Sequence, residues 1–368
     1  MWNLVVVVID KIKMRRRLLT YSVILLLLAS CSVIDEDLSG CEPKPEPEKS
    51  SSLTYDLQLV TNMTTELRTE LELKMDIDLA GEIRQHLSGI FTDFAHDVDL
   101  SFYDTVGDSV LLQKDEHIMD ANQASYTLNL PMREYMHLAA ANVVDNELVA
   151  VSNDNRCHRS MLSQVIRDTI DSHSTGLFTA RQPMEVLGDV SQHFNVHLYI
   201  ANCAAGLVID PRDHGTLDDI RVFSTGFATG FNICDSVFQY SQWPPIVKTT
   251  LVKAENQKKG AFLSVTFPSK EPASAGTRNV IETEEPFIAQ PGDEPLWEFR
   301  VYVPHQSSKT RGETTYTETV LRVKEPLRAG QLKLIKCWVG PNSEVMTNNP
   351  EVSTSVTMDW EPGLVIEN

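Results

Sequence analysis

Apolar and polar residues alternate along most of the chain from residue 53 onward, which is the pattern of β-strands with one buried face. The most regular example runs from Leu71 to Leu79, where apolar residues alternate with charged ones without a break. The run from Tyr135 to Val144 is almost continuously apolar, so we expect a strand that is buried on both faces. Further strands are predicted over residues 53–59, 98–102, 126–130, 194–200, 261–267, 297–303, 317–323, 332–339 and 356–360.

Helical spacing of apolar residues is found in only two segments. Residues 79–91 carry apolar side chains three and four positions apart, which predicts a short helix. A second helix is predicted over residues 160–170, with Ser160 as its N-cap and with Val165 and Ile166 on its apolar face. Many short strands with one or two short helices predict an all-β chain built from β-sandwiches.

The alternating pattern is weakest between residues 176 and 189, and Pro183 lies inside this stretch. We therefore place a domain boundary near residue 182. The folded part would then consist of an N-terminal β-sandwich, residues 53–182, and a C-terminal β-sandwich, residues 183–368.

The first 30 residues read as an export signal. A basic cluster between Lys11 and Arg17 precedes an apolar stretch, Leu18–Ser30, which at 13 residues is shorter than a membrane span. The stretch ends in Leu-Ala-Ser-Cys, which looks like the lipobox of a bacterial lipoprotein, so Cys31 is predicted to carry lipid. A signal without lipidation is the alternative, and Met14 is an alternative start of the chain.

Residues 31–52 have the composition of a tether. Asp35, Glu36 and Asp37 follow the predicted lipid site and resemble a surface-export signal, although an acidic run is also typical of a solvated linker. Residues 42–48 alternate proline with charge, which favours a stiff, extended spacer. Stable anchoring takes two or more acyl chains, and a lipoprotein head group carries several.

Charge and motifs argue against several functions. The 368-residue chain has 32 basic and 51 acidic residues and a net charge of −19. Such an acidic chain is not expected to bind nucleic acid, whose phosphates require a basic surface. It contains no nucleophile elbow, phosphate-binding loop or zinc-protease motif, so we expect neither an enzyme nor a cofactor. His193 and His197 fall on the polar face of a predicted strand and are interpreted as surface residues rather than metal ligands.

The positions of the cysteines and tryptophans bear on disulfide pairing and on sugar binding. Beyond the predicted lipid site, the spacing of the other cysteines does not choose disulfide partners in an oxidising compartment. These are Cys41, Cys157, Cys203, Cys234 and Cys337. Trp297 and Trp360 fall on apolar strand faces and are expected in the core, whereas a sugar-stacking surface would use a tryptophan such as Trp243.

The predicted mature start, Cys31–Cys41, has a cysteine predicted to carry lipid, an acidic Asp-Leu-Ser segment and a second cysteine. This start and three further segments resemble the FimB-type fimbrial anchor lipoproteins of Bacteroidetes. Asp97–Asp104 resembles an early strand of that family, and Tyr135–Asn142 resembles its Tyr-then-Asn core strand. Val352–Gly363 resembles its closing strand with Asp-Trp-x-Pro-Gly, whereas residues 205–295 match no segment of the family that we can name.

The resemblance implies two tandem transthyretin-like β-sandwiches and a role in cell adhesion without catalysis. A family member is attached to the outer membrane at the cell surface through lipid on Cys31, lies at the base of a fimbrium (pilus) and limits its length. Its partners are shaft subunits bound by strand addition. The alternatives are a shaft or tip fimbrillin processed near Arg68, or a glycan-binding surface lipoprotein.

Overall fold

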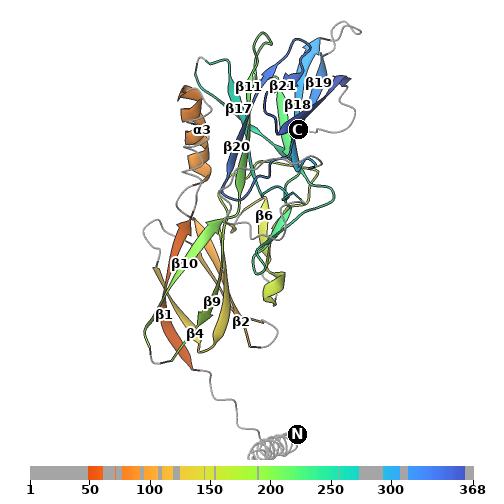
Figure 1. The fold of residues 1–368 in the computed structure, drawn as a ribbon. Coiled ribbons are helices and arrows are strands. Elements are labelled where there is room, and N and C mark those ends of the chain that lie inside the picture. Colours follow the sequence, from red (N-terminus) through yellow and green to blue (C-terminus); the bar gives the residue numbers. More distant parts are fainter. Residues whose placement is uncertain are drawn as a thin grey trace, which may run out of the picture. The chain divides into compact units, whose positions relative to one another are not determined.

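The computed structural model describes residues 49–60, 71, 77–91, 95–106, 110–118, 125–144, 146–152, 155–188, 190–255, 257–272, 293–306 and 314–360. These residues belong to one compact unit (Figure 1). The described residues contain four β-sheets, one α-helix and one 3₁₀ turn, which agrees with the predicted all-β class. In this part of the chain no helix is both long enough and apolar enough to span a bilayer.

The first β-sandwich is a single seven-stranded sheet, sheet A, that curls over its own core. Its strand order is β3-β2-β5-β9-β10-β1-β4. The bounds are β1 Ser50–Val60, β2 Asp97–Asp104, β3 Leu111–Ile118, β4 Ser125–Pro131, β5 Glu134–Ala141, β9 Phe178–Glu185 and β10 Gln192–Ile200. Two strands separate β1 from β5, yet Tyr55 of β1 contacts His137 of β5 with ring centroids 5.1 Å apart. The two halves of the sheet therefore face each other.

The second β-sandwich is made of two separate sheets, D and E. Sheet D has the order β22-β19-β18-β12-β15-β8, and sheet E has the order β16-β17-β11-β20-β21. Leu207 of β11 and Phe299 of β18 are fully buried in the same core, which shows that the two sheets pack face to face. In sheet D the strands are β8 Thr169–Ile170, β12 Arg221–Thr225, β15 Ile246–Lys248, β18 Trp297–Gln306, β19 Thr314–Val323 and β22 Val352–Trp360. In sheet E they are β11 Cys203–Asp210, β16 Thr250–Lys253, β17 Gly260–Thr266, β20 Leu332–Val339 and β21 Val345–Met346.

A small fourth sheet, sheet C, joins segments from the two halves of the sequence. It has the order β14-β13-β7-β6, with β6 Val149–Ser152, β7 Met161–Gln164, β13 Gly230–Asn232 and β14 Val237–Gln239. Its apolar cluster includes Tyr103 and Leu138 from the outer face of sheet A. Strand β2 is therefore covered on both faces, which explains why the predicted polar residues Asp97, Asp99 and Ser101 are all buried.

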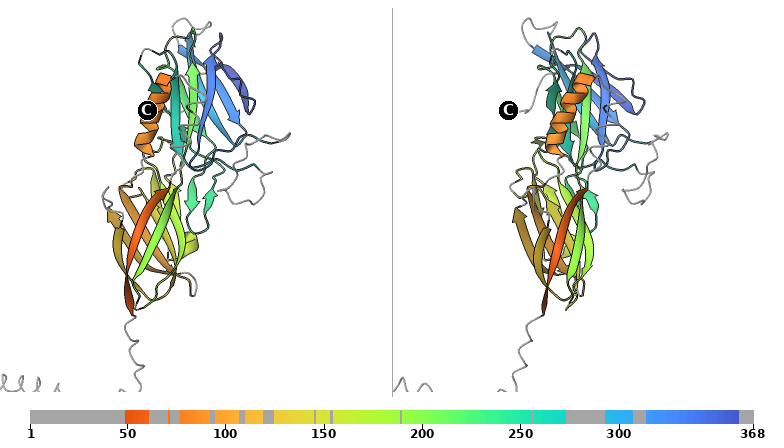
Figure 2. Two further views of the ribbon diagram at one scale, coloured as in Figure 1. Left: turned by 60° about the vertical axis from the view of Figure 1, so that its left-hand side comes forward. Right: turned by 90° about the vertical axis from the view of Figure 1, so that its left-hand side faces the viewer.

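The single α-helix of the described residues, α3 (Ile77–Ile90), covers the outer face of sheet E. Its buried side chains recur every four residues along one face and are Leu79, Ile83 and Leu87. They share a core cluster with Leu263 of β17 and Leu334 of β20. Figure 2 shows the helix lying along that sheet.

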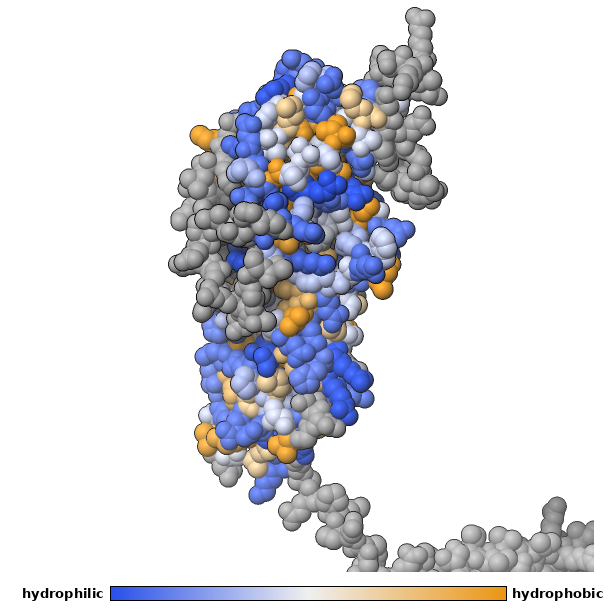
Figure 3. Space-filling model, turned by 45° about the vertical axis from the view of Figure 1, so that its right-hand side comes forward, coloured by the Kyte–Doolittle hydropathy of each residue, from blue (hydrophilic) through white to orange (hydrophobic). Residues whose placement is uncertain are grey.

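The exposed surface is mainly hydrophilic on the face drawn in Figure 3, where hydrophobic residues form small, separate patches. Several large apolar side chains of the described chain are exposed in different elements and turns. Examples are Ile77, Val106, Ile166 and Trp243. Scattered apolar side chains are common on folded proteins and do not by themselves mark a binding surface.

The helix prediction over residues 79–91 is confirmed, but two other local predictions are wrong. Ile77–Leu79 belong to α3 and not to the predicted strand over residues 71–79, of which residues 72–76 lie outside the described part. The helix predicted over residues 160–170 is replaced by β7 and β8. Ile166, assigned to its apolar face, is 99% exposed, because the segment pairs in two different sheets.

The expected domain boundary near residue 182 falls inside β9. Strand β9 pairs with β5 over its whole length, and β10 stays in the same sheet beside β9 and β1. The first passage from sheet A to sheet E comes after Ile200, between β10 and β11. The pause in the alternation at residues 176–189 therefore reflects a strand containing Pro183 and not a linker.

Candidate functional site

The residues predicted to attach the chain to a membrane lie outside the described residues. These are Cys31, Asp35, Glu36, Asp37 and the processing candidate Arg68. Their roles stay predictions. What the structure describes is the point at which the predicted tether enters the fold, at Lys49 and β1.

Strand β1 lies inside sheet A and is paired along both edges. It runs parallel to β10 from Leu53 to Val60 and antiparallel to β4 from Ser50 to Asp56. Leu53, Tyr55 and Leu57 point into the core and are at most 5% exposed. The strand that follows the tether is therefore built into both the hydrogen-bond ladder and the core.

A buried polar contact fastens β1 to the opposite half of the sheet. The Nδ1 of His137 lies 3.2 Å from the carbonyl oxygen of Ser101, so this nitrogen carries the proton and donates it. The Nε2 of His137 then accepts the hydroxyl hydrogen of Tyr55. Burial lowers the pKa of His137 to about 3 and raises the pKa of Tyr55, so both side chains are neutral and serve a structural role.

Tyr135 and Asn142, the first and last residues of the segment Tyr135–Asn142, each stabilise a turn at one end of β5. The hydroxyl of Tyr135 donates to the carbonyl oxygen of Pro131 at 2.8 Å, which closes the turn between β4 and β5. Asn142 has a φ of 62°, a left-handed conformation that asparagine tolerates. Its side chain accepts from the backbone of His96 and donates to the carbonyl oxygen of Gly176, both at 2.7 Å.

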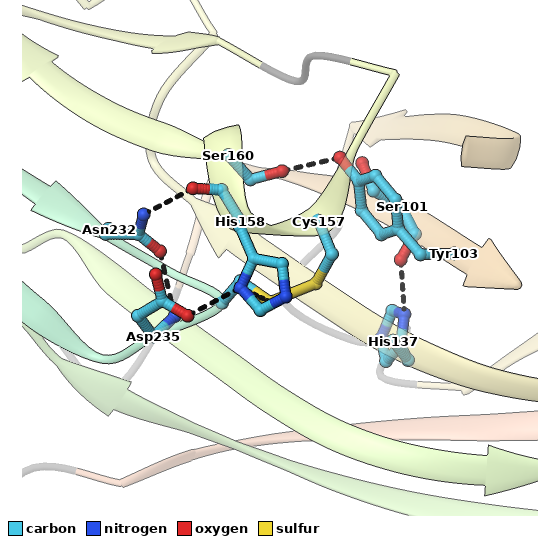
Figure 4. The surroundings of a disulfide bond; sticks show 9 residues. Ser101, Tyr103, His137, Cys157, His158, Ser160, Asn232 and Asp235 are labelled. Atoms are coloured by element: carbon cyan, nitrogen blue, oxygen red, sulfur yellow. Dashed lines mark hydrogen bonds and ion pairs between the residues drawn. A yellow bond between two sulfur atoms is a disulfide. The ribbon is translucent and has the colours of Figure 1, made fainter. Parts of the chain in front are cut away.

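A disulfide between Cys157 and Cys234 joins the two halves of the sequence beside sheet C. The two residues are 77 positions apart, and their Cα atoms are separated by 5.6 Å. Cys157 begins the 3₁₀ turn Cys157–Arg159, and Cys234 lies in the turn between β13 and β14. Asn232 braces the contact, because its amide donates to the carbonyl oxygen of His158 at 2.7 Å and its side-chain oxygen accepts from the backbone of Asp235 at 2.8 Å (Figure 4).

The disulfide is flanked by a histidine and a carboxylate. The Nδ1 of His158 lies 2.8 Å from Oδ1 of Asp235 and 3.9 Å from the sulfur of Cys234. Among the described residues this is the one group of three potential metal ligands, with ligand atoms within 4.8 Å of one another. The sulfur of Cys234 is held in the disulfide and offers no thiolate, so two protein ligands remain in this state.

The other candidate ligands are surface residues. His193 pairs with Asp56 at 2.8 Å and is exposed, and His197 is exposed as well. Neither belongs to a metal-ligand group in the described part of the chain. Trp297 is 2% exposed, as expected for a core residue, whereas Trp243 is 83% exposed; the side chain of Trp360 lies outside the described residues.

Among the described residues, strand β22 forms an edge of sheet D. It pairs with β19 and is the terminal strand in the order of that sheet. Residues 353–358 are exposed, and Val356 and Met358 are 45% and 54% exposed on the same face. An edge strand with exposed apolar residues and few charges is a template for pairing with another chain.

Sequence reasoning missed both the disulfide and the edge position of β22 among the described strands. Nothing in the spacing of Cys157 and Cys234 marks them as partners, because the contact depends on sheet C joining distant segments. The alternation in β22 was visible, but alternation alone does not tell an edge strand from a central one.

Comparison with known proteins finds likeness at the level of structure. No protein-family model and no curated protein matches the chain. A proposed adhesin from Bacteroides ovatus is 12% identical, with a TM-score of 0.47, and the match covers 85% of this chain and 99% of that one. The fimbrial anchor protein Mfa2 from Porphyromonas gingivalis is 10% identical, with a TM-score of 0.46 and coverages of 85% and 98%.

A third solved structure is a proposed polysaccharide-binding protein from Bacteroides thetaiotaomicron. It is 8% identical, with a TM-score of 0.46, and the match covers 84% of this chain and 99% of that one. Fimbrial and adhesin proteins of Bacteroidetes are thus represented among the structures that this chain resembles.

Proposed function

We propose that this chain is a lipid-anchored fimbrial subunit that attaches the base of a fimbrium to the outer membrane and limits its length. Lipid on Cys31 holds the membrane, and the second β-sandwich binds the first shaft subunit. The proposal assigns no catalytic step to the chain. It rests on the order of parts along the sequence, from lipobox through tether to two β-sandwiches.

The observation that carries the proposal is the position of β1. A pull on the tether reaches the fold at Lys49 and acts along β1, which is paired with β10 on one side and β4 on the other. Because the pull acts along the strand, the hydrogen bonds to β10 and to β4 bear the load together and do not break one at a time. Leu53, Tyr55 and Leu57 add buried contacts that also resist extraction of the strand.

Strand β22 is the surface that we assign to the shaft subunit. It belongs to the second β-sandwich, whereas the tether enters the first, so the two attachments use different sheets. Its exposed residues 353–358 carry no charge, which suits strand addition.

The proposal is tested by replacing Cys31 with Ala. Fimbriae should be released into the medium, because the lipid that holds them to the membrane is lost. Cys41→Ala is the matched control and should leave fimbriae attached to cells. Fimbriae that remain cell-bound in the Cys31→Ala strain would contradict the proposal.

A shaft or tip subunit is the main alternative. Cleavage after Arg68 would remove β1, and with it the partner of both β10 and β4 and three core side chains. The intact mass and N-terminus of the mature protein decide between the two. A lipid-modified Cys31 supports an anchor, whereas an N-terminus after Arg68 supports a polymerising subunit.

A glycan-binding lipoprotein is favoured by one observation, the exposure of Trp243. Its indole is 83% exposed and is available for stacking on a sugar ring. Retention on polysaccharide gels that is lost in Trp243→Ala would support this function.

A further inference from the structure

We propose that the disulfide-flanking cluster, Cys157, His158, Cys234 and Asp235, becomes a zinc-type metal site when the disulfide is reduced. The inference does not depend on the proposed function, because it concerns side chains beside sheet C and neither the tether nor β22. Each cysteine is followed directly by a second potential ligand, and the disulfide brings the two pairs together.

Three of the four side chains already lie within ligand distance of one another, and the fourth, Cys157, is bonded to one of them. A tetrahedral zinc ion bonds sulfur at about 2.3 Å and nitrogen or oxygen at about 2.0–2.2 Å, so its ligand atoms lie roughly 3.3–3.8 Å apart. The Nδ1 of His158 is 3.9 Å from the sulfur of Cys234 and 2.8 Å from Oδ1 of Asp235. His158, Cys234 and Asp235 thus lie close enough to share one ion, and the sulfur of Cys157 has to turn toward them once its bond to Cys234 is broken.

The two cysteines of the cluster are buried, whereas its histidine and aspartate are exposed to solvent. Cys157 and Cys234 are 1% and 3% exposed, whereas the side chains of His158 and Asp235 are 69% and 45% exposed. An ion can therefore enter from solvent and meet the sulfurs at the inner side. Asn232 holds the backbone on both sides of the cluster, so the ligands stay close after the covalent bond is gone.

The chemistry balances with a thiol or phosphine as the reductant. The reductant supplies two electrons, the S–S bond breaks, and two protons give the thiols of Cys157 and Cys234. Binding of Zn²⁺ then displaces both protons, and the two thiolates become ligands. The neutral imidazole of His158 contributes its Nδ1 lone pair, and the carboxylate of Asp235 completes the set.

The test is metal titration of the full chain, with Cys31→Ser and Cys41→Ser as background so that the tether contributes no thiol. The protein is reduced with a phosphine, and free thiols at positions 157 and 234 are verified by mass spectrometry. We expect one equivalent of Zn²⁺ to bind, and Co²⁺ to give thiolate-to-cobalt charge-transfer bands. The oxidised protein should show neither.

Two exposed substitutions make the test specific. His158→Ala should weaken Zn²⁺ binding by at least about tenfold, because one of four ligands is lost. His193→Ala is the matched control, since His193 also pairs with an aspartate at 2.8 Å but belongs to no such ligand group in the described chain, and it should leave affinity unchanged. Absence of binding to the verified dithiol, or equal affinity in His158→Ala, would overturn the proposal.

Discussion

Tyr55 and His137 form a buried hydrogen bond across the interior of sheet A, between the strand that follows the tether and the opposite half of the sheet. The imidazole also stacks on Phe102, with ring centroids 4.5 Å apart. Because Nδ1 donates its hydrogen to the carbonyl oxygen of Ser101, Nε2 is the acceptor and the hydroxyl of Tyr55 is its donor. The contact couples the position of β1 to the closure of the first β-sandwich.

Removing this hydroxyl should destabilise the protein. Tyr55→Phe leaves Nε2 of His137 buried without a donor, which costs about 1–3 kcal/mol of unfolding free energy. Urea denaturation followed by tryptophan fluorescence measures the change. Tyr199→Phe is the control, because Tyr199 is 52% exposed, and it should change stability little. Equal stability of the two variants would show that the hydrogen bond contributes nothing.

Acid should destabilise the fold through two buried histidines. Burial lowers the pKa of His137 to about 3 and that of His173 to about 4, whereas an unfolded histidine has a pKa of about 6.5. Below pH 6.5 the unfolded state therefore binds more protons, so stability falls as pH decreases. At pH 4.5 each histidine should cost roughly 2–3 kcal/mol relative to pH 7.

The measurement is urea denaturation at pH 7 and pH 4.5. His173→Gln should reduce the difference between the two values, whereas His197→Gln, at an exposed position, should leave it unchanged. An unaltered pH dependence in His173→Gln would contradict the assignment.

The alternation of apolar and polar residues predicted strands better than it predicted which faces of those strands other sheets cover. Strand β2 alternates cleanly, yet Asp97 and Asp99 are buried because sheet C covers the face expected to meet solvent. Asp97 accepts from the backbone of Val143 at 2.9 Å, and Asp99 pairs with Lys114 at 3.0 Å, so their burial is compensated. These partners lie on β3 and in the segment after β5, and periodicity within β2 alone cannot reveal them.

The same limit applies to the candidate sites. Leu79 fits both a strand period and a helix period, and the choice between them depends on the sheet that α3 covers. His158 and Asp235 come together because β7 pairs with β13, although the two strands are far apart in the sequence. By contrast, the predicted lipid site at Cys31 depends only on consecutive residues, which is why sequence alone could indicate it.

Loss of the disulfide should lower stability. Replacing Cys157 and Cys234 with Ala removes a cross-link between residues 77 positions apart, which should cost about 2–4 kcal/mol of unfolding free energy. Urea denaturation of the oxidised proteins measures the difference. Under a reductant the wild-type chain loses the same cross-link, so the gap between the two proteins should narrow; a gap that persists would point to lost packing instead.

Two glycines should respond to alanine in opposite directions. Gly81 lies in α3 with nothing within 4 Å of an added Cβ, so Gly81→Ala should stabilise the protein by about 0.5–1 kcal/mol. Gly226 has a φ of 101°, and an added Cβ would lie 2.7 Å from Cα of Trp297. Gly226→Ala should therefore destabilise by about 1–3 kcal/mol. Thermal denaturation of both variants checks the signs, and a stabilising effect at Gly226 would contradict the backbone argument.

Lysines on the edge strand β22 should block binding of the shaft subunit without unfolding the protein. Val356→Lys with Met358→Lys places two cations on the exposed face of β22, where both side chains already contact solvent, so stability should change by less than about 1 kcal/mol. Strand addition should be blocked, because charged edge strands resist pairing. The protein should remain in the outer membrane while fimbriae appear in the medium. Val237→Lys, at a residue 54% exposed on β14 of sheet C, is the control and should retain fimbriae. If fimbriae stay attached in the β22 variant, the shaft subunit binds elsewhere on the chain.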